Sequence, residues 1–323
     1  MNAPLQTEHS PFHRGEREMQ SRIGKQDRME KIGRTVIRPF MPDQHRDFFA
    51  QLPFVFLGSV DQDGWPWASI LSGRPGFLSS PNDRQLRVQA RPHPNDPLAD
   101  ALVHNTPLGL LGLELSTRRR NRLNATIGEV SETDILLDVT QSFGNCPKYI
   151  QTHVVDFIRE PGSEAKRSKI ERFNELAIAA RDMITSANAL YVASYADTDQ
   201  GRSVDVSHRG GRSGFVKVQG NSLLVPDFQG NNFFNTLGNF LVTQRAGLLF
   251  PDYQTGDVLM LTGTVNVLQE QHPDIAVFEG AQRGWRFELV SGIRIHDALP
   301  FRAELTEYSP NSLSTGSWST AAR

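Results

Sequence analysis

A short polar run in the second half of the chain carries the residue types that bind anions. Ser207, Arg209, Gly210 and Gly211 lie within five positions of one another, and Lys217 follows them. Arginine offers a fork of N–H donors, and glycine lets a backbone approach a ligand closely. The run therefore predicts a site for a phosphate or another polyanion. A solvated hairpin loop would have a similar composition, and that alternative stays open.

A second polar run lies a little further along the chain. It contains Pro226-Asp227 and then Gly230-Asn231-Asn232. The asparagine amides add neutral donors beside a glycine that favours a turn, so we expect this run to serve the same site. The chain has no Walker loop and no G-x-G-x-x-G turn that follows a strand and opens a helix. The P-loop and Rossmann modes of nucleotide binding are therefore not predicted.

The segment that contains the polar run matches an earlier segment of the chain at a constant offset of 138 residues. The second segment has Arg209 and Lys217 where the first has Leu71 and Ser79. The same offset places Lys148 opposite Arg286. A period this long predicts two copies of one domain, of which only the second carries the anion-binding groups. The matched pairs include Ser69 and Ser207, Gly76 and Gly214, Gly109 and Gly247, Leu123 and Leu261, and Thr126 and Thr264.

Short apolar runs and turns predict the elements that position these residues. Residues 54–60 and 66–71 flank a turn at 61–64, and the pattern restarts at 189–192. Such spacing predicts a mainly β (α+β) fold built from closed barrels. Amphipathic helices are expected over 16–37 and over 163–187, the latter with Ser163 as its N-cap.

These patterns divide the chain into five parts. We expect a tail and helix, a first barrel, a connecting helix, a second barrel with the anion site, and a flexible C-terminal tail rich in Ser and Thr. The expected boundaries are 1–45, 46–160, 161–188, 189–302 and 303–323.

Composition excludes several classes of function. The 323 residues carry a net charge of −2, which gives no general field for nucleic acid, and no apolar run is long enough for a membrane helix. The basic cluster Arg118–Arg122 is interpreted as a charged loop that leads into an edge strand, and nucleic-acid or polyphosphate binding is the alternative. Cys146 is the sole cysteine, so neither an internal disulfide nor a cysteine-rich metal site is possible. We expect a cytoplasmic protein without a metal.

Several segments of the sequence together resemble a known family. They resemble the pyridoxamine 5′-phosphate oxidase-like flavoproteins, and more narrowly their predicted flavin-nucleotide-binding branch. The resemblance implies two tandem FMN-binding split β-barrels with flanking helices, and FMN bound at an interface between two barrels. The segments are 205–211, 214–216, 224–227, 230–232, 10–13, 118–122 and 146–150.

The resemblance also implies roles for individual residues. Ser207, Arg209 and Lys217, with Gly210 and Gly211 beside them, would hold the phosphate or ribityl chain of FMN. Pro226 and Asp227 would face the flavin ring, while Asn231, Asn232 and, across the interface, Lys148 would lie near the phosphate. The interface would belong to a homodimer or to an intramolecular pseudo-dimer.

The resulting functional prediction is an FMN-dependent oxidoreductase. Its donor would be a reduced nicotinamide or another two-electron donor, and no residue stands out as a catalytic acid or base. Two alternatives stay open. One is a flavin carrier, sensor or assembly subunit without enzyme activity. The other is a haem-binding or haem-degrading protein on the same barrel, with His208 or His296 as the ligand.

Overall fold

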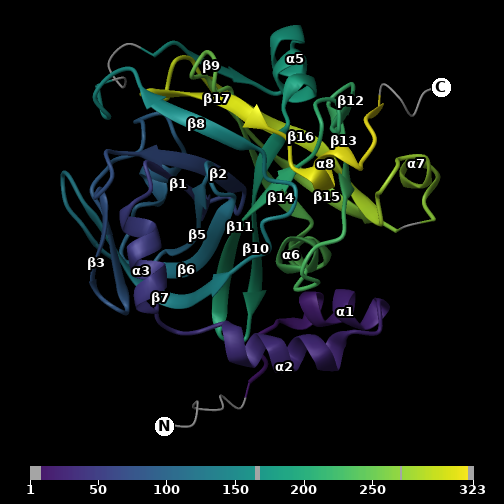
Figure 1. Cartoon of the computed structure of the whole chain (residues 1–323), viewed down its shortest axis with the longest axis horizontal. Helices are drawn as coiled ribbons and strands as arrows, with labels where there is room; N and C mark the ends of the chain where they lie inside the picture. Colours follow the sequence, from purple (N-terminus) through teal and green to yellow (C-terminus); the bar gives the residue numbers. More distant parts are fainter. Residues whose placement is uncertain (1–8, 164–167, 270, 319–323) are drawn as a thin grey trace.

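The structure, a computed structural model, describes residues 9–163, 168–269 and 271–318. It is mainly β, with two large antiparallel sheets, a small two-stranded sheet and short helices around them (Figure 1). The mainly β (α+β) class predicted from the sequence is confirmed.

The first large sheet has seven strands in the order β2-β1-β5-β6-β7-β4-β3. Its central strands come from the apolar runs of the sequence, and every residue of β1 is buried. Short apolar runs of this kind are typical of antiparallel sheets that close into a barrel. The strands are β1 (Phe54–Val60), β2 (Pro66–Ser72), β3 (Leu78–Asn82), β4 (Gln85–Val88), β5 (Pro107–Glu114), β6 (Arg119–Val130) and β7 (Ile135–Gly144).

The second large sheet repeats this order as β11-β10-β14-β15-β16-β13-β12, with β9 added beside β16. The register is repeated as well. Leu57 lies opposite Ser69 and Leu110 in the first sheet, and Val192 lies opposite Ser207 and Leu248 in the second. The strands are β9 (Ile170–Phe173), β10 (Ala189–Thr198), β11 (Gly201–Gly210), β12 (Lys217–Gln219), β13 (Ser222–Asp227), β14 (Arg245–Pro251), β15 (Val258–Leu268) and β16 (Arg283–Ile295).

The two barrels contact each other in a reciprocal way. A Cβ added to Gly109 in β5 would lie 2.5 Å from the Val204 carbonyl oxygen, and one added to Gly247 in β14 would lie 2.4 Å from the Pro66 carbonyl oxygen. Each pair is the other displaced by 138 residues. The barrels therefore face each other through matching surfaces, as the two subunits of a symmetric dimer do.

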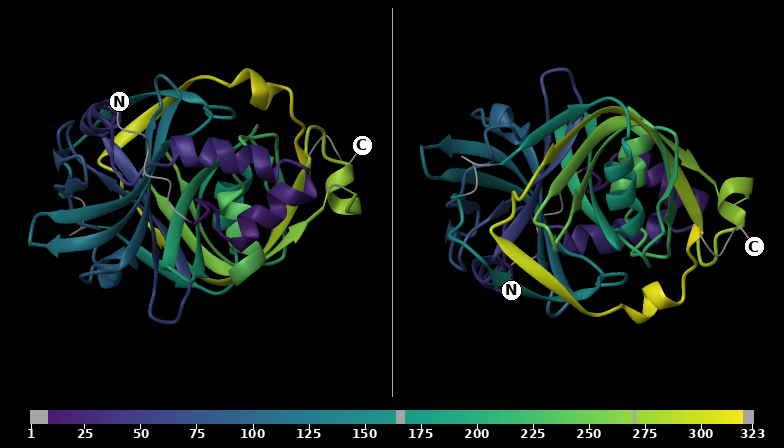
Figure 2. Two further views of the ribbon diagram at one scale, coloured as in Figure 1. Left: turned by 90° about the horizontal axis from the view of Figure 1, so that it is seen from below. Right: turned by 90° about the horizontal axis from the view of Figure 1, so that it is seen from above.

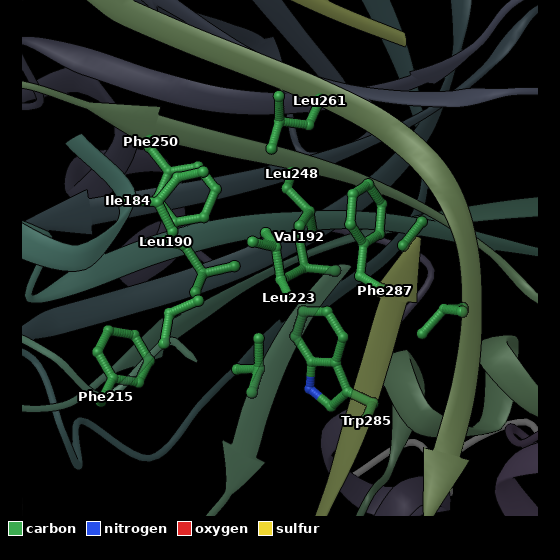
Figure 3. Packing of buried hydrophobic residues seen from close by; sticks show 14 of the residues in the cluster. Ile184, Leu190, Val192, Phe215, Leu223, Leu248, Phe250, Leu261, Trp285 and Phe287 are labelled. Atoms are coloured by element: carbon green, nitrogen blue, oxygen red, sulfur yellow. The ribbon is translucent and has the colours of Figure 1, made fainter. Parts of the chain in front are cut away.

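Three hydrophobic clusters hold this arrangement together. One fills the first barrel, and another fills the second barrel around Trp285, Phe287 and Leu248 (Figure 3). The third lies between the barrels, where Phe56 of β1 stacks on Tyr191 of β10. Full burial of each such side chain contributes about 1.5–3 kcal/mol, so the barrels are joined by a core of their own.

Helices close the ends of the barrels. Figures 1 and 2 show α1 and α2 next to the second barrel, where α1 packs on α6. The predicted helix over 16–37 is broken into these two at Gly24, whose φ is +64°. The helices are α1 (Arg14–Arg22), α2 (Gln26–Val36), α3 (Asp43–Ala50), α4 (Leu98–Ala101), α5 (Ile178–Ser186), α6 (Asn235–Thr243), α7 (Pro273–Ala276) and α8 (Pro310–Leu313).

The connecting helix predicted over 163–187 is shorter in the structure. Ile170 and Phe173 belong to strand β9, which pairs with β16, and among the described residues of this range only α5 is helical. Residues 164–167 lie outside the described part. The free edge of β16 offers a strand partner, and tertiary pairing of this kind overrides a helical pattern. The Ser163 hydroxyl donates to the Glu160 carbonyl, and the first turn that it was expected to cap lies outside the described part.

The expected flexible tail after residue 302 is wrong for the part that the structure describes. Strand β17 (Phe301–Glu307) pairs with β8 (Thr152–Phe157), and α8 follows it. Gln151 donates a 2.9 Å hydrogen bond to the buried Ser312 hydroxyl, and Trp318 packs against Phe278. Four of the serines and threonines in this segment are buried: Ser309, Ser312, Thr315 and Ser317.

Candidate anion site between the barrels

A small cavity with a strongly basic lining lies where the barrels meet. Arg120 and Arg122 reach it from β6 of the first barrel, and they share a face because side chains two apart on a strand point the same way. Arg209 comes from β11 and Arg283 from β16 of the second barrel. The cavity volume is about 80 Å³. Four guanidinium groups thus line a space large enough for a small anion.

Arg122 forms the main polar link between the barrels at this cavity. One of its Nη atoms donates to the hydroxyl of Ser207, and the other donates to Asn235 Oδ1 over 3.0 Å. The Ser207 and Thr236 hydroxyls lie 2.5 Å apart. Asp205 is the nearest carboxylate, 3.7 Å from Arg122 Nη1. This network holds the guanidinium in place between β6, β11 and α6.

Among the described residues, a single carboxylate, that of Asp227, lines the cavity together with the four arginines. It accepts a hydrogen bond from Arg209 and lies 3.7 Å from Arg283 Nε. Arg283 also lies over the Phe234 ring, with its guanidinium carbon 4.9 Å from the ring centroid. One carboxylate cannot neutralise four guanidinium groups, so the lining carries an excess of positive charge.

The lining also contains donors without acceptors. Among the described residues, five buried nitrogen atoms around this cavity have no hydrogen-bond partner. Buried donors are nearly always paired, so a group of orphans around one space indicates an acceptor that belongs there. The five atoms are Arg120 Nε, Arg122 Nε, Arg209 Nε, Arg283 Nη1 and Asn145 Nδ2.

The titration behaviour of the site reflects the same imbalance. Burial, and then the neighbouring Arg122, lower the pKa of Arg120 to about 9. Burial lowers the pKa of Arg122 to about 10, with Asp205 opposing the shift. Burial also holds the pKa of His208 well below its usual value, and Arg120 and Arg209 lower it further, so His208 is neutral at pH 7. An anion would relieve the electrostatic cost that burial and the neighbouring arginines impose on Arg120 and Arg122.

The loop between β13 and α6 closes one side of the cavity. Asn231 donates a 2.8 Å hydrogen bond from its amide to Asn145 Oδ1, and its own Oδ1 accepts from the Phe233 backbone. Asn232 and Phe234 have φ values of +63° and +62°. Backbone in this region is costly for residues other than glycine, and it recurs at ligand-binding sites. The bonds of Asn231 hold the loop in this conformation.

Five of the residues predicted for the site line this cavity. They are Ser207, Arg209, Asp227, Asn231 and Asn232.

The other five predicted residues lie elsewhere. Gly210 packs against Tyr149, since an added Cβ would meet the Tyr149 carbonyl oxygen at 2.0 Å, and Gly211 packs against Phe215 in the same way. Lys217 lies over the Trp318 ring, 5.0 Å from its centroid. Pro226 in β13 is buried beside Gly284, and Lys148 lies in the turn after β7. None of them is among the residues that line the cavity.

The proposed match of Lys148 with Arg286 is wrong. Leu86 lies opposite Leu137 in the first barrel, and its counterpart Leu224 lies opposite Arg286 in the second. Arg286 therefore corresponds to Leu137. It forms a 2.6 Å ion pair with Asp274 of α7, in the segment that follows β15 and breaks the offset.

The sequence did not single out Arg120, Arg122 or Arg283 for this site. The run from Arg118 was interpreted as a charged loop, yet β6 begins at Arg119. Arg118 pairs with Glu307 and Arg119 lies over the Phe48 ring, so only alternate residues of the run face the cavity. The spacing of Arg120 and Arg122, two residues apart in a strand, was the signal in the sequence that could have identified them.

The corresponding place on the other side of the interface is apolar. Leu71 stands there for Arg209, Val258 for Arg120, and Met260 for Arg122; all three are buried in hydrophobic clusters. Ser69, the counterpart of Ser207, donates a 2.6 Å hydrogen bond to the buried Asp96. The two barrels thus form one basic site and one apolar counterpart.

A larger cleft of about 950 Å³ lies next to the arginine cavity. It is bounded by the segment 9–17, by β5 to β7 of the first barrel and by the hairpin of β10 and β11. Asn235 lines both spaces. Its size falls within the range of about 300–1,000 Å³ that is typical of small-molecule sites.

Comparison with known proteins places the first barrel in a family. The family model described as pyridoxamine 5′-phosphate oxidase matches residues 41–168. This barrel belongs to the pyridoxamine 5′-phosphate oxidase-like split-barrel family. The family recognised from the sequence is therefore confirmed at this level. The narrower flavin-nucleotide-binding branch stays a prediction. No curated protein matches the chain.

Solved structures similar to this split-barrel chain have low identity. HupZ from Group A Streptococcus is 10% identical, with 42% of this chain and 98% of that chain covered and a TM-score of 0.28. HutZ, the haem storage protein from Vibrio cholerae, is 9% identical, with 36% and 92% covered and a TM-score of 0.28. Such low TM-scores carry no conclusion about function.

Two kinds of feature are absent from the described ranges. No helix there is long and apolar enough to cross a membrane. No group of three or more His, Cys, Asp or Glu side chains in the same residues is arranged to hold a metal ion.

Proposed function

We propose that the chain binds FMN and holds the phosphate of the nucleotide in the arginine cavity. The observation that carries the proposal is the group of five orphan donors around a space with four guanidinium groups and one carboxylate. A phosphate ester is close to doubly charged at neutral pH and accepts several hydrogen bonds. Arginine forks match phosphate geometry better than any other side chain.

The family of the first barrel supports flavin as the rest of the ligand. The cavity of about 80 Å³ has room for the phosphate alone. The neighbouring cleft of about 950 Å³ has room for a ribityl chain and a ring system, and Asn235 borders both. The ligand would thus extend from the arginines toward the cleft, between the two barrels.

Bound FMN would supply two-electron chemistry, and the chain would supply binding, orientation and control of access. We propose that the protein is an oxidoreductase whose donor is a reduced nicotinamide or a similar two-electron donor. A flavin carrier, sensor or assembly subunit would use the same site without turnover. The two possibilities differ in whether the flavin is reduced and reoxidised catalytically.

The repeated strand order supports a further proposal about origin and assembly. We infer that an internal duplication joined two barrels that would otherwise meet as a homodimer. The reciprocal contacts of Gly109 with Val204 and of Gly247 with Pro66 would form such an interface within one chain. A complete flavin site then needs no second copy of the chain.

The visible spectrum of the purified protein tests the proposal. Flavin bands, or their appearance after FMN is added, would support it, and anaerobic bleaching by NADH or NADPH with turnover in air would support the enzyme over the carrier. A Soret band would instead favour haem. For that reading the available histidines are His208, which lines the small cavity, and His296, which lies 3.2 Å from both Glu171 and Asp257. A colourless protein that ignores FMN would overturn the proposal.

A further inference from the structure

Glu16, on the N-terminal helix α1, is a buried carboxyl group that borders the cleft. It is 4% exposed. Its Oε2 accepts a 2.8 Å hydrogen bond from the His13 backbone, which completes a capping box at the start of α1. Its Oε1 accepts a hydrogen bond from the side-chain amide of Asn235.

Asn235 connects this carboxyl group to the arginine cavity. Its amide nitrogen donates to Glu16, and its amide oxygen accepts the 3.0 Å hydrogen bond from Arg122 Nη1. The amide is therefore held at both ends, and its orientation is determined by a carboxyl group on one side and a guanidinium on the other. A change at Glu16 reaches Arg122 through one side chain.

Close packing of two helices fixes the position of Glu16. A Cβ added to Gly15 would lie 2.2 Å from the Gly238 carbonyl oxygen in α6, and one added to Gly238 would lie 2.6 Å from the Glu16 nitrogen. Only glycine at both positions allows α1 and α6 to approach this closely. The packing brings a residue near the start of the chain to an interface formed by strands far along it.

Two buried carboxyl groups share the charge of Arg122. Asp205 is also 4% exposed; it accepts a 2.9 Å hydrogen bond from Asn239 and lies 3.7 Å from Arg122 Nη1. His13, the N-cap residue of α1, lies 3.5 Å from Glu16, and Asp197, Asp199 and Arg202 line the same cleft. Burial lowers the pKa of His13, so it is neutral at pH 7, and Arg14 and Arg17 border the cleft. The single buried guanidinium of Arg122 cannot neutralise two carboxylates and an incoming anion at the same time.

We propose that Glu16 is a positioning residue of the arginine cavity, which aligns Arg122 through Asn235 and, in alkaline solution, takes up a proton when an anion fills the cavity. The inference rests on the anion-binding half of the proposed function and not on flavin as the ligand. Burial, and then Asp205, raise the pKa of Glu16 to about 8; the hydrogen bonds from the His13 backbone and from Asn235, and then the charge of Arg122, oppose the shift. An anion beside Arg122 offsets the attraction of that guanidinium, so it raises the pKa of Glu16 further.

The direction of the effect follows from linkage. Below pH 8, Glu16 already carries its proton in the free protein, and anion binding requires no uptake. Above pH 8, the free protein must gain a proton to bind, so affinity falls with rising pH by up to about tenfold per unit. Arg120 and Arg122 also lose charge at higher pH, and the test must separate their effect from that of Glu16.

Calorimetric titration with inorganic sulfate provides the test, because sulfate stays doubly charged across this range. The unchanged protein is titrated at pH 7 and pH 9, and at pH 8.5 in two buffers with different ionisation enthalpies. Glu16→Gln imitates the protonated acid, and Glu18→Gln, an exposed residue on the same helix, is the matched control. The loss due to the arginines is common to all three proteins.

We expect proton uptake by the unchanged protein at pH 8.5 and much less by Glu16→Gln. The ratio of the sulfate affinity of Glu16→Gln to that of the unchanged protein should be up to about tenfold higher at pH 9 than at pH 7. Equal pH profiles, or no proton uptake by the unchanged protein, would overturn the inference. The measurement of proton uptake by the unchanged protein needs no variant. Sulfate binding with this linkage but without FMN binding would refute the flavin proposal and leave this inference intact.

Discussion

The guanidinium of Arg122, in the first barrel, donates a hydrogen bond to the hydroxyl of Ser207, in the second. Both side chains are buried, at 6% and 2% exposure, so the bond lies inside the interface. Buried polar groups need hydrogen-bond partners, and in this pair each barrel supplies the partner of the other. The anion site therefore depends on the contact between the barrels, and neither barrel forms it alone.

Arg209→Ala should weaken FMN binding by about 10- to 100-fold. A charge-assisted hydrogen bond contributes about 1.5–3 kcal/mol, and this side chain lines the cavity beside Asp227. Lys217→Ala is the control, because Lys217 belongs to the same polar run but lies over Trp318. Fluorescence titration with FMN measures both. Equal losses in the two variants would argue against the cavity as the phosphate site.

Arg120→Met should stabilise the protein when no anion is present. Within the described residues no carboxylate pairs with Arg120, and its pKa is lowered to about 9 because burial opposes its charge. At pH 7 we expect the free energy of unfolding to rise by about 1–3 kcal/mol. Urea unfolding in chloride buffer measures this change.

The same variant should lose most of the stabilisation that sulfate gives the unchanged protein, because the ligand then binds more weakly. Arg119→Met is the matched control, since Arg119 lies outside the cavity over Phe48. If Arg120→Met is less stable without sulfate and responds to sulfate normally, Arg120 has a structural role and does not bind the anion.

Each chain should bind one FMN. The apolar Leu71, Val258 and Met260 replace three arginines at the counterpart of the site. A phosphate there would lose its hydration without gaining charged partners. The ratio of bound flavin absorbance to protein concentration gives the number of sites, and a value near two per chain would contradict the asymmetry.

Asp96→Asn should stabilise the protein near neutral pH and change little near pH 4. Burial raises the pKa of Asp96 from 3.8 to about 6. The folded state thus binds a proton more tightly than the unfolded state, and stability falls as pH rises between these values. The expected gain above pH 6 is up to about 3 kcal/mol. Thermal unfolding at pH 4.5 and pH 7.5 measures it, and equal gains at both would show another cause.

The repeat could be predicted from the sequence because glycines and turns limit what may replace them. Gly109 and Gly247 match because each barrel needs a backbone without a side chain where the other barrel approaches. The strands that contain these glycines could be predicted as well, because both barrels repeat the same apolar runs. Their apolar residues fill cores that the fold repeats.

The remaining errors come from tertiary context. Ile170 and Phe173 have a helical spacing, but the edge of β16 draws them into a strand. Arg120 and Arg122 belong to the first barrel, for which the sequence predicted no arginine in the site. Their role appears only when β6 is placed against β11, which no local pattern shows. Half of the predicted site residues line the cavity, and two of them, Ser207 and Arg209, alternate on one face of β11.

Paired titrations of the flavin-free protein with FMN and with riboflavin test the central claim most directly. The two ligands share the ring and the ribityl chain and differ in the phosphate alone. If the arginine cavity holds that phosphate, FMN should bind at least about 100-fold more tightly, the equivalent of two charge-assisted hydrogen bonds, and added sulfate should compete with it. Equal affinities for FMN and riboflavin, or no binding of either, would contradict the account.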